Sequence, residues 1–245
     1  MLSQIVLGVV QGIFEWIPVS SEGLVALLSK FFFQSSRPLQ MALFLHLGTL
    51  FAALIYFRKD WKEIILLKDK KTLKFLIIST LISLLIGFPL YKFVNSITLG
   101  ASLLLLTGLG LFATSYFHKS KKRNSLSENS LALFSGLLQG FSVIPGLSRS
   151  GVTIFGLSFG RENPKEILKL SYLMSVPVGI ASSLYLILED GGIILDAWLG
   201  LLISFAVGIF ALKLIFKFIK RVNFSKFTFL FGVICVLGAL ISFLS

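Results

Sequence analysis

Residues 8–23 of this chain read G-V-V-Q-G-I-F-E-W-I-P-V-S-S-E-G, and residues 136–151 read G-L-L-Q-G-F-S-V-I-P-G-L-S-R-S-G. In each, a glycine, two apolar residues and Gln-Gly precede Ile-Pro, serines and a closing glycine, with a one-residue shift around the proline. Each proline is flanked by apolar pieces of only about 20 Å as helices, at residues 2–14, 20–33, 130–143 and 148–160. Such a pair is typical of a re-entrant hairpin, which enters the membrane and leaves it on the same side.

The composition of the whole chain indicates a multi-pass membrane protein. Of 245 residues, 56% are hydrophobic and 14% are charged, and the mean hydropathy is +0.92. Six segments can each cross about 30 Å of hydrocarbon, at residues 38–57, 75–93, 98–117, 167–188, 194–216 and 227–244. The net charge of +12 does not indicate a nucleic-acid partner, because no basic module stands apart from the apolar segments.

The positions of the basic residues support this layout. If both hairpins are re-entrant, 19 of the 23 Lys and Arg residues fall on one side, in residues 58–74, 119–123, 161–169 and 213–226. The positive-inside rule places these loops in the cytoplasm of a cell whose plasma membrane the chain crosses, and both termini outside. A single span in place of either hairpin would destroy this segregation.

The chain is therefore expected to be a duplication. Residues 1–118 form one repeat with its hairpin at 1–33, residues 119–129 a cytoplasmic linker, and residues 130–245 a second repeat with its hairpin at 130–160. Three spans follow each hairpin, so the second repeat starts from the opposite side. Chance could produce two similar glycine-rich stretches, but the matching three-span period argues against it. We expect an all-α membrane protein with six transmembrane helices and two re-entrant hairpins, arranged as two inverted-topology repeats.

Two ionisable residues lie inside the breaks, Glu15 in the first and Arg149 in the second. A charged side chain in a membrane costs about 2.5–3.5 kcal/mol on insertion scales, so such residues usually serve a function. Hairpins that enter from opposite faces would let the two side chains approach each other. A purely structural ion pair that locks the repeats together is the alternative.

The neighbours of these two residues favour a phosphate site. Arg149 lies between Ser148 and Ser150, and Ser20 and Ser21 open a helix after Pro18. Free backbone N–H groups at helix starts, hydroxyl donors and a guanidinium together suit phosphate binding or phosphoryl transfer. Helix N-capping would explain any one of the serines alone.

Two motifs carry a resemblance to a known family, Gln11-Gly12-x-x-Glu15-x-x-Pro18-x-Ser20-Ser21-x-Gly23 and Pro145-Gly146-x-Ser148-Arg149-Ser150-Gly151-x-Thr153. They resemble the two signatures of undecaprenyl pyrophosphate phosphatases of the bacitracin-resistance type. The order of elements also matches over essentially the whole chain, including the His46-Leu-Gly-Thr stretch and the Tyr172 to Pro177 span.

The resemblance implies a membrane hydrolase that removes the terminal phosphate of a polyprenyl diphosphate, recycling the lipid carrier for cell-surface glycan synthesis. It implies that Ser21 is the nucleophile and that Glu15 handles the proton or binds a metal. It also implies a divalent cation, Mg²⁺ or Ca²⁺, to neutralise the diphosphate. The residues expected to bind phosphate are Arg149, Ser20, Ser148, Ser150, Thr153 and Gly146. A homodimer is retained as an option.

Three positions depart from the family pattern. Gln11 stands where glutamate is common, Leu24 where many members carry a catalytic histidine, and Glu22 where a small hydroxyl residue is frequent. The leucine puts the acid–base step in doubt. Glu22 is a secondary candidate as proton donor or metal ligand, with helix capping as the alternative, and Gln11 is a second secondary candidate.

A second class of function uses the same residues. A transporter or flippase of polyprenyl phosphate also needs a phosphate clamp, and inverted repeats with broken helices are typical of such carriers. A structural subunit would not explain an arginine in the membrane. His46 is expected to donate a hydrogen bond between helices rather than to act as a catalytic base.

Overall fold

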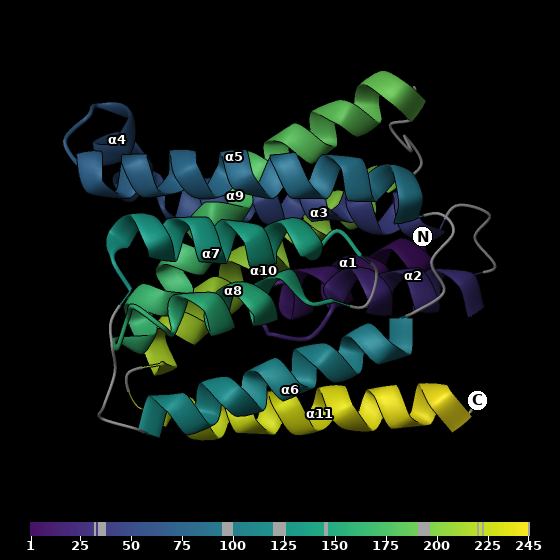
Figure 1. Cartoon of the computed structure of the whole chain (residues 1–245). Coiled ribbons are helices and arrows are strands. Elements are labelled where there is room, and N and C mark those ends of the chain that lie inside the picture. The colour runs from purple at the N-terminus through teal and green to yellow at the C-terminus, as the bar shows by residue number, and fades with distance from the viewer. Residues whose placement is uncertain are drawn as a thin grey trace.

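The computed structural model describes residues 1–31, 33, 38–94, 100–119, 126–144, 147–190, 197–219, 221 and 223–244. Within these residues the chain is all-helical, without a β-strand (Figure 1). The helices are α1 (Leu2–Phe14), α2 (Ser21–Phe31), α3 (Pro38–Tyr56), α4 (Arg58–Ile65), α5 (Lys70–Val94), α6 (Gly100–Lys119), α7 (Glu128–Phe141), α8 (Arg149–Leu157), α9 (Pro164–Asp190), α10 (Trp198–Phe218) and α11 (Phe224–Leu244).

The helices lie where the sequence pattern predicts apolar segments. The four short pieces correspond to α1, α2, α7 and α8, and the six long segments to α3, α5, α6, α9, α10 and α11. The helix that was not predicted is α4, in the first basic loop. It follows α3 at a bend of 74°, and its amphipathic sequence holds Ile64 in the core while its charged residues stay at the surface.

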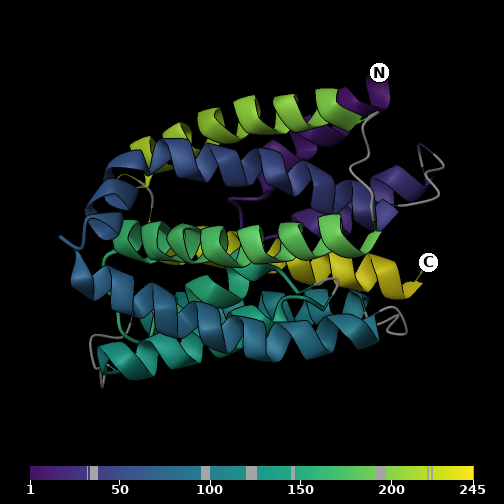
Figure 2. The same ribbon diagram turned by 90° about the horizontal axis from the view of Figure 1, so that it is seen from above.

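Four helices in the described part of the chain are long and apolar enough to cross a membrane, namely α5, α9, α10 and α11. The bent pair α3–α4 makes a fifth candidate, and α6 contributes the shorter apolar stretch Leu104–Tyr116. These lengths fit a multi-pass membrane protein. Both termini lie at one end of the molecule, and α4 and the start of α7 lie at the other (Figures 1 and 2).

The two halves of the chain exchange their short helices. α1 packs on α10 and α7 packs on α5, so the first helix of each broken pair lies on a long helix from the other half. The leading glycines of the two similar stretches allow this. A Cβ atom on Gly8 would lie 2.5 Å from the Gly200 carbonyl oxygen, and one on Gly136 would lie 2.6 Å from the Ser79 carbonyl oxygen. Small residues at such contacts let membrane helices approach closely.

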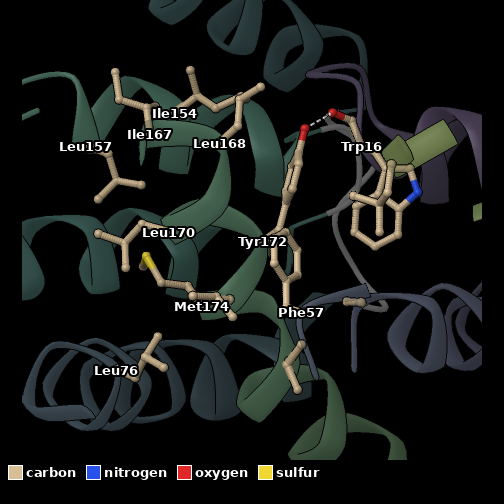
Figure 3. Packing of buried hydrophobic residues seen from close by; sticks show 14 of the residues in the cluster. Trp16, Phe57, Leu76, Ile154, Leu157, Ile167, Leu168, Leu170, Tyr172 and Met174 are labelled. Carbon is tan, nitrogen blue, oxygen red and sulfur yellow. Dashed lines mark hydrogen bonds between the residues drawn. The ribbon is translucent and has the colours of Figure 1, made fainter. Parts of the chain in front are cut away.

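A buried aromatic pair fixes the chain at the first break (Figure 3). The hydroxyl of Tyr172 on α9 donates a 2.5 Å hydrogen bond to the carbonyl oxygen of Trp16, and the two rings meet edge to face at 5.2 Å. Both side chains are almost fully buried. This contact holds the segment after α1 against α9, which runs between α3 and α5 in Figure 2.

Candidate active site

The first break places a carboxylate inside the protein. α1 ends at Phe14, and Glu15 follows it with helical backbone angles and is only 4% exposed. Its Oε2 atom accepts hydrogen bonds from Nε2 of Gln11 at 2.8 Å and from Oγ of Ser21 at 2.9 Å. Since a buried charge needs such partners, Gln11 positions the carboxylate, and Ser21 is placed where Glu15 can take its proton.

The second break brings an arginine to the same carboxylate. Arg149 is the first residue of α8, and its Nη2 atom forms an ion pair with Oε1 of Glu15. Its Nη1 atom is buried and has no hydrogen-bond partner among the described residues. The approach of Glu15 and Arg149, expected from the mirrored breaks, is therefore present. One strong donor of the guanidinium is left over for a ligand.

Four serines of the two motifs line a polar cavity, and two of them also cap helices. Oγ of Ser148 caps α8 by accepting from the Gly151 N–H at 3.2 Å, and Oγ of Ser20 accepts from the Gly23 N–H at 3.3 Å. Oγ of Ser150 donates to the Ile17 carbonyl oxygen at 2.9 Å, so it ties one hairpin to the other. Ser20, Ser21, Ser148 and Ser150 all line the same polar cavity.

Two of the positions singled out in the sequence, Thr153 and Leu24, do not line this cavity. The Thr153 hydroxyl is fully buried behind Arg149, where it lies 2.8 Å from the Arg149 carbonyl oxygen and 2.6 Å from Oγ of Ser171. It braces α8 against α9 in this arrangement. Leu24 is not among the residues that line either cavity described below. Gly146 falls outside the described residues.

His46 is the site residue that the sequence reasoning undervalued. It comes from α3, and its Nδ1 atom lies 3.1 Å from Oε2 of Glu15 and 3.3 Å from Nε2 of Gln11. It does join two helices, as expected, but it does so at the central carboxylate and beside the cavity. Its position in an otherwise uncharged apolar helix was the signal that could have identified it. Ser142, which directly follows α7 and also lines the cavity, carried no such signal.

Glu22 provides a second carboxylate at the same place. It is partly exposed and lines the polar cavity. Among the described residues no hydrogen bond or ion pair involves its side chain, in contrast to Glu15. It is therefore the carboxylate with oxygens to spare.

Two cavities meet at these residues. The polar one has a volume of about 20 Å³, room for about one water molecule. The second has a volume of about 640 Å³ and is mostly apolar, well within the range of ligand pockets. Four residues line both, namely Glu22, His46, Ser142 and Arg149. The polar cavity is thus too small for a phosphate while Glu15 and Arg149 are paired, and it adjoins the large apolar cavity.

The donor set matches a divalent cation only in part. No cluster of three His, Cys, Asp or Glu side chains that could hold a metal occurs in the described residues. Both oxygens of Glu15 are occupied by protein groups. Mg²⁺ commonly binds through one or two carboxylates together with substrate phosphates, and Glu22 beside Glu15 offers that kind of site.

These features define a multi-pass membrane protein with a small polar cavity and a buried Glu–Arg ion pair where two broken helix pairs meet. Residues 4–240 match the family model described as bacitracin resistance protein BacA, and the chain belongs to this family.

Its relatives agree over nearly their full length. The undecaprenyl-diphosphatase of Methanococcoides burtonii is 36% identical over 95% of this chain and 96% of the relative. Those of Haloarcula marismortui and Methanothrix thermoacetophila are 31% and 32% identical, covering 98% and 95% of this chain and 98% and 94% of the relatives.

Proposed function

We propose that this protein hydrolyses undecaprenyl diphosphate, or a closely similar polyprenyl diphosphate, to the monophosphate and inorganic phosphate, and so recycles the lipid carrier for cell-surface glycan synthesis. The observation that carries the proposal is the meeting of Ser21, Glu15 and Arg149 beside a large apolar cavity. The family and the names of its relatives support the same reaction. No observation favours the polyprenyl-phosphate transporter considered above.

Substrate binding would exchange one ion pair for another. The terminal phosphate competes with Glu15 for the guanidinium of Arg149, whose Nη1 atom already lacks a partner. The N-termini of α2 and α8 add backbone N–H groups, and the hydroxyls of Ser148 and Ser20 lie beside them. Because the polar cavity holds only one water, this exchange has to open it. It also frees Glu15 from its charge partner.

The chemical step follows from the Ser21–Glu15 hydrogen bond. Oγ of Ser21 attacks the terminal phosphorus and passes its proton to Glu15, while the bond to the lipid monophosphate breaks and the leaving group takes that proton. Glu15 then accepts a proton from the attacking water and returns it to Oγ of Ser21 as inorganic phosphate leaves. In the alternative, Ser21 only orients the water.

We also propose a divalent cation, Mg²⁺ or Ca²⁺, that arrives with the diphosphate. Bound there, it would neutralise charge on the phosphates. Glu22 is the better-placed protein ligand because no described residue hydrogen-bonds to its oxygens, and Glu15 could join it once Arg149 moves to the phosphate.

The topology expected from the sequence is part of the proposal: six transmembrane helices, two re-entrant hairpins and two inverted repeats, with basic loops in the cytoplasm and both termini outside. The reciprocal packing of α1 on α10 and α7 on α5 supports it. Labelling of single cysteines in a Cys235→Ala background tests it. An impermeant reagent should reach Leu2→Cys from outside and Lys68→Cys from inside.

A homodimer stays a prediction, which native mass spectrometry tests.

Phosphate release from undecaprenyl diphosphate by the purified protein is the direct test. We expect turnover in the wild type and a loss of at least a hundredfold in Ser21→Ala. Ser29→Ala is the matched control, because Ser29 is a buried serine of the same helix whose hydroxyl has no hydrogen-bond partner in the described part of the chain. Wild-type turnover in Ser21→Ala would overturn the site, and no turnover in the wild type would overturn the function.

A further inference from the structure

The large cavity continues directly from the phosphate site. Arg149 and His46 line both cavities, so a molecule whose phosphates reach Arg149 has its next atoms in the large cavity. The remaining walls are mostly apolar and come from α3, α5, α7 and α9. From this arrangement we expect the cavity to bind the part of the prenyl tail nearest the diphosphate.

The cavity lies along parts of two helices. Its lining includes Ser83 to Tyr91 on α5 and Val178 to Tyr185 on α9, which correspond to about 10–12 Å of each helix axis. Aromatic rings form part of the wall: Tyr185 meets Phe88 at 5.2 Å and Tyr91 at 5.5 Å, both edge to face. This part of the wall therefore consists of aromatic side chains packed against one another.

The volume sets how much tail fits. A cavity of about 150 Å³ binds benzene, which corresponds to about 25 Å³ per carbon atom. By that ratio the 640 Å³ cavity holds about 25 carbon atoms, or five isoprene units. The phosphate nearest the lipid shares the space, which leaves room for four to five units.

We propose that this cavity contacts only the first four to five isoprene units of the prenyl tail, so that kcat/KM does not depend on the length of the tail beyond them. The inference rests on the proposed function, since it assumes a prenyl diphosphate at Arg149. A shorter tail leaves part of the cavity without contacts, which loses dispersion energy. Units beyond the cavity lie against lipid, which is as apolar as the protein surface, so they add little.

A series of prenyl diphosphates from C10 to C55, in the same mixed micelles at fixed surface concentration, tests this. We expect kcat/KM for phosphate release to rise at least tenfold from C10 to C20 and to change less than twofold from C25 to C55. A steady rise up to C55, or a flat profile from C10, would overturn the inference while leaving the function intact. No release from any member of the series would instead count against the function.

A pair of variants on α9 locates the effect. Ala181 lines the cavity, whereas the adjacent Ile180 is 49% exposed on the outside of the helix. Ala181→Phe should move the plateau to about C15 and lower kcat/KM for C55 at least fivefold, with less than a twofold change for C10. Ile180→Phe should leave the profile unchanged. An equal loss for C10 and C55 in Ala181→Phe would contradict the role of this cavity.

Discussion

At the scale of single residues, the contact between Glu15 and Arg149 could be a structural lock or a working pair. A purely structural ion pair would need only two opposite charges that neutralise each other inside the protein. The structure adds features that a lock does not require, namely an unpaired Nη1 atom on Arg149 and a serine hydroxyl donated to Glu15. These features favour a working pair.

Breaking and restoring the charge balance separates the two roles. Arg149→Met should lower the free energy of unfolding by about 3–5 kcal/mol, because it leaves a buried carboxylate unpaired. Glu15→Gln combined with Arg149→Met should recover most of that stability, as judged by thermal unfolding in detergent. Phosphate release should stay absent in the double variant. Recovered activity there would show that the pair is only structural.

His46 should contribute to turnover through Glu15. In His46→Gln the amide can still donate a hydrogen bond to Oε2 of Glu15, but it cannot carry a proton. We expect kcat to fall by about 10²-fold, because the amide cannot take up a proton beside Glu15 as the imidazole can, with the thermal midpoint nearly unchanged. A kcat within threefold of the wild type would reduce His46 to a positioning role.

The meeting of Glu15 with Arg149 could be predicted from the sequence, whereas the approach of His46 to Glu15 could not, for a physical reason. Glu15, Ser21 and Arg149 were predictable because charged and hydroxyl residues are conspicuous inside apolar breaks. His46 lies 31 positions beyond Glu15, in another helix. Its approach to Glu15 depends on how α3 packs beside α1, which no local pattern encodes.

At the scale of helices, prolines, glycines and serines marked where the helices end, and so their positions were predictable. The short α4 was not, because a charged segment of eight residues reads as a loop until its apolar face finds a partner. Which helices pack together could not be predicted from local sequence patterns, because it depends on contacts between distant parts of the chain.

The glycines at those contacts should not tolerate a methyl group. Gly136→Ala would drive a Cβ atom against the backbone of Ser79 and should destabilise the protein by about 1–3 kcal/mol. Gly110→Ala is the control, since the nearest atom to its Cβ would be Cγ of Phe155 at 3.9 Å. Thermal unfolding compares them, and equal midpoints would contradict the close approach of α7 and α5.

A surface ion pair ties the start of α7 to the end of the second hairpin. Arg161 donates to both carboxylate oxygens of Glu128 at 2.6 and 2.7 Å, and these hydrogen bonds lower the pKa of Glu128 from 4.5 to about 2. A lowered pKa stabilises the folded state above pH 4.5, and the stabilisation is lost as the pH falls towards 2. The pair is partly exposed, so its contribution is below about 1 kcal/mol.

Glu128→Gln should therefore lower the thermal midpoint slightly at pH 7. The difference from the wild type should shrink as the pH falls from 4.5 to 2. A difference that is constant over that range would show that the pair does not depend on the charge of Glu128.

At the scale of the whole molecule, each half of the chain supplies what the other lacks. The first half provides Ser21, Glu15 and His46, and the second provides Arg149. The exchange of short helices between halves brings these groups to one place. The large cavity lies beside them and is lined by helices of both halves. The two similar stretches thus meet at one asymmetric site, to which each contributes different side chains.

The stereochemical course at the terminal phosphorus tests the central claim, that Ser21 from one hairpin attacks a phosphate held by Arg149 of the other. The measurement uses a polyprenyl diphosphate whose terminal phosphorus is made chiral with sulfur and oxygen isotopes. Attack by serine followed by water is two in-line displacements, so the account predicts overall retention of configuration. Overall inversion would show a single attack by water and would contradict the account.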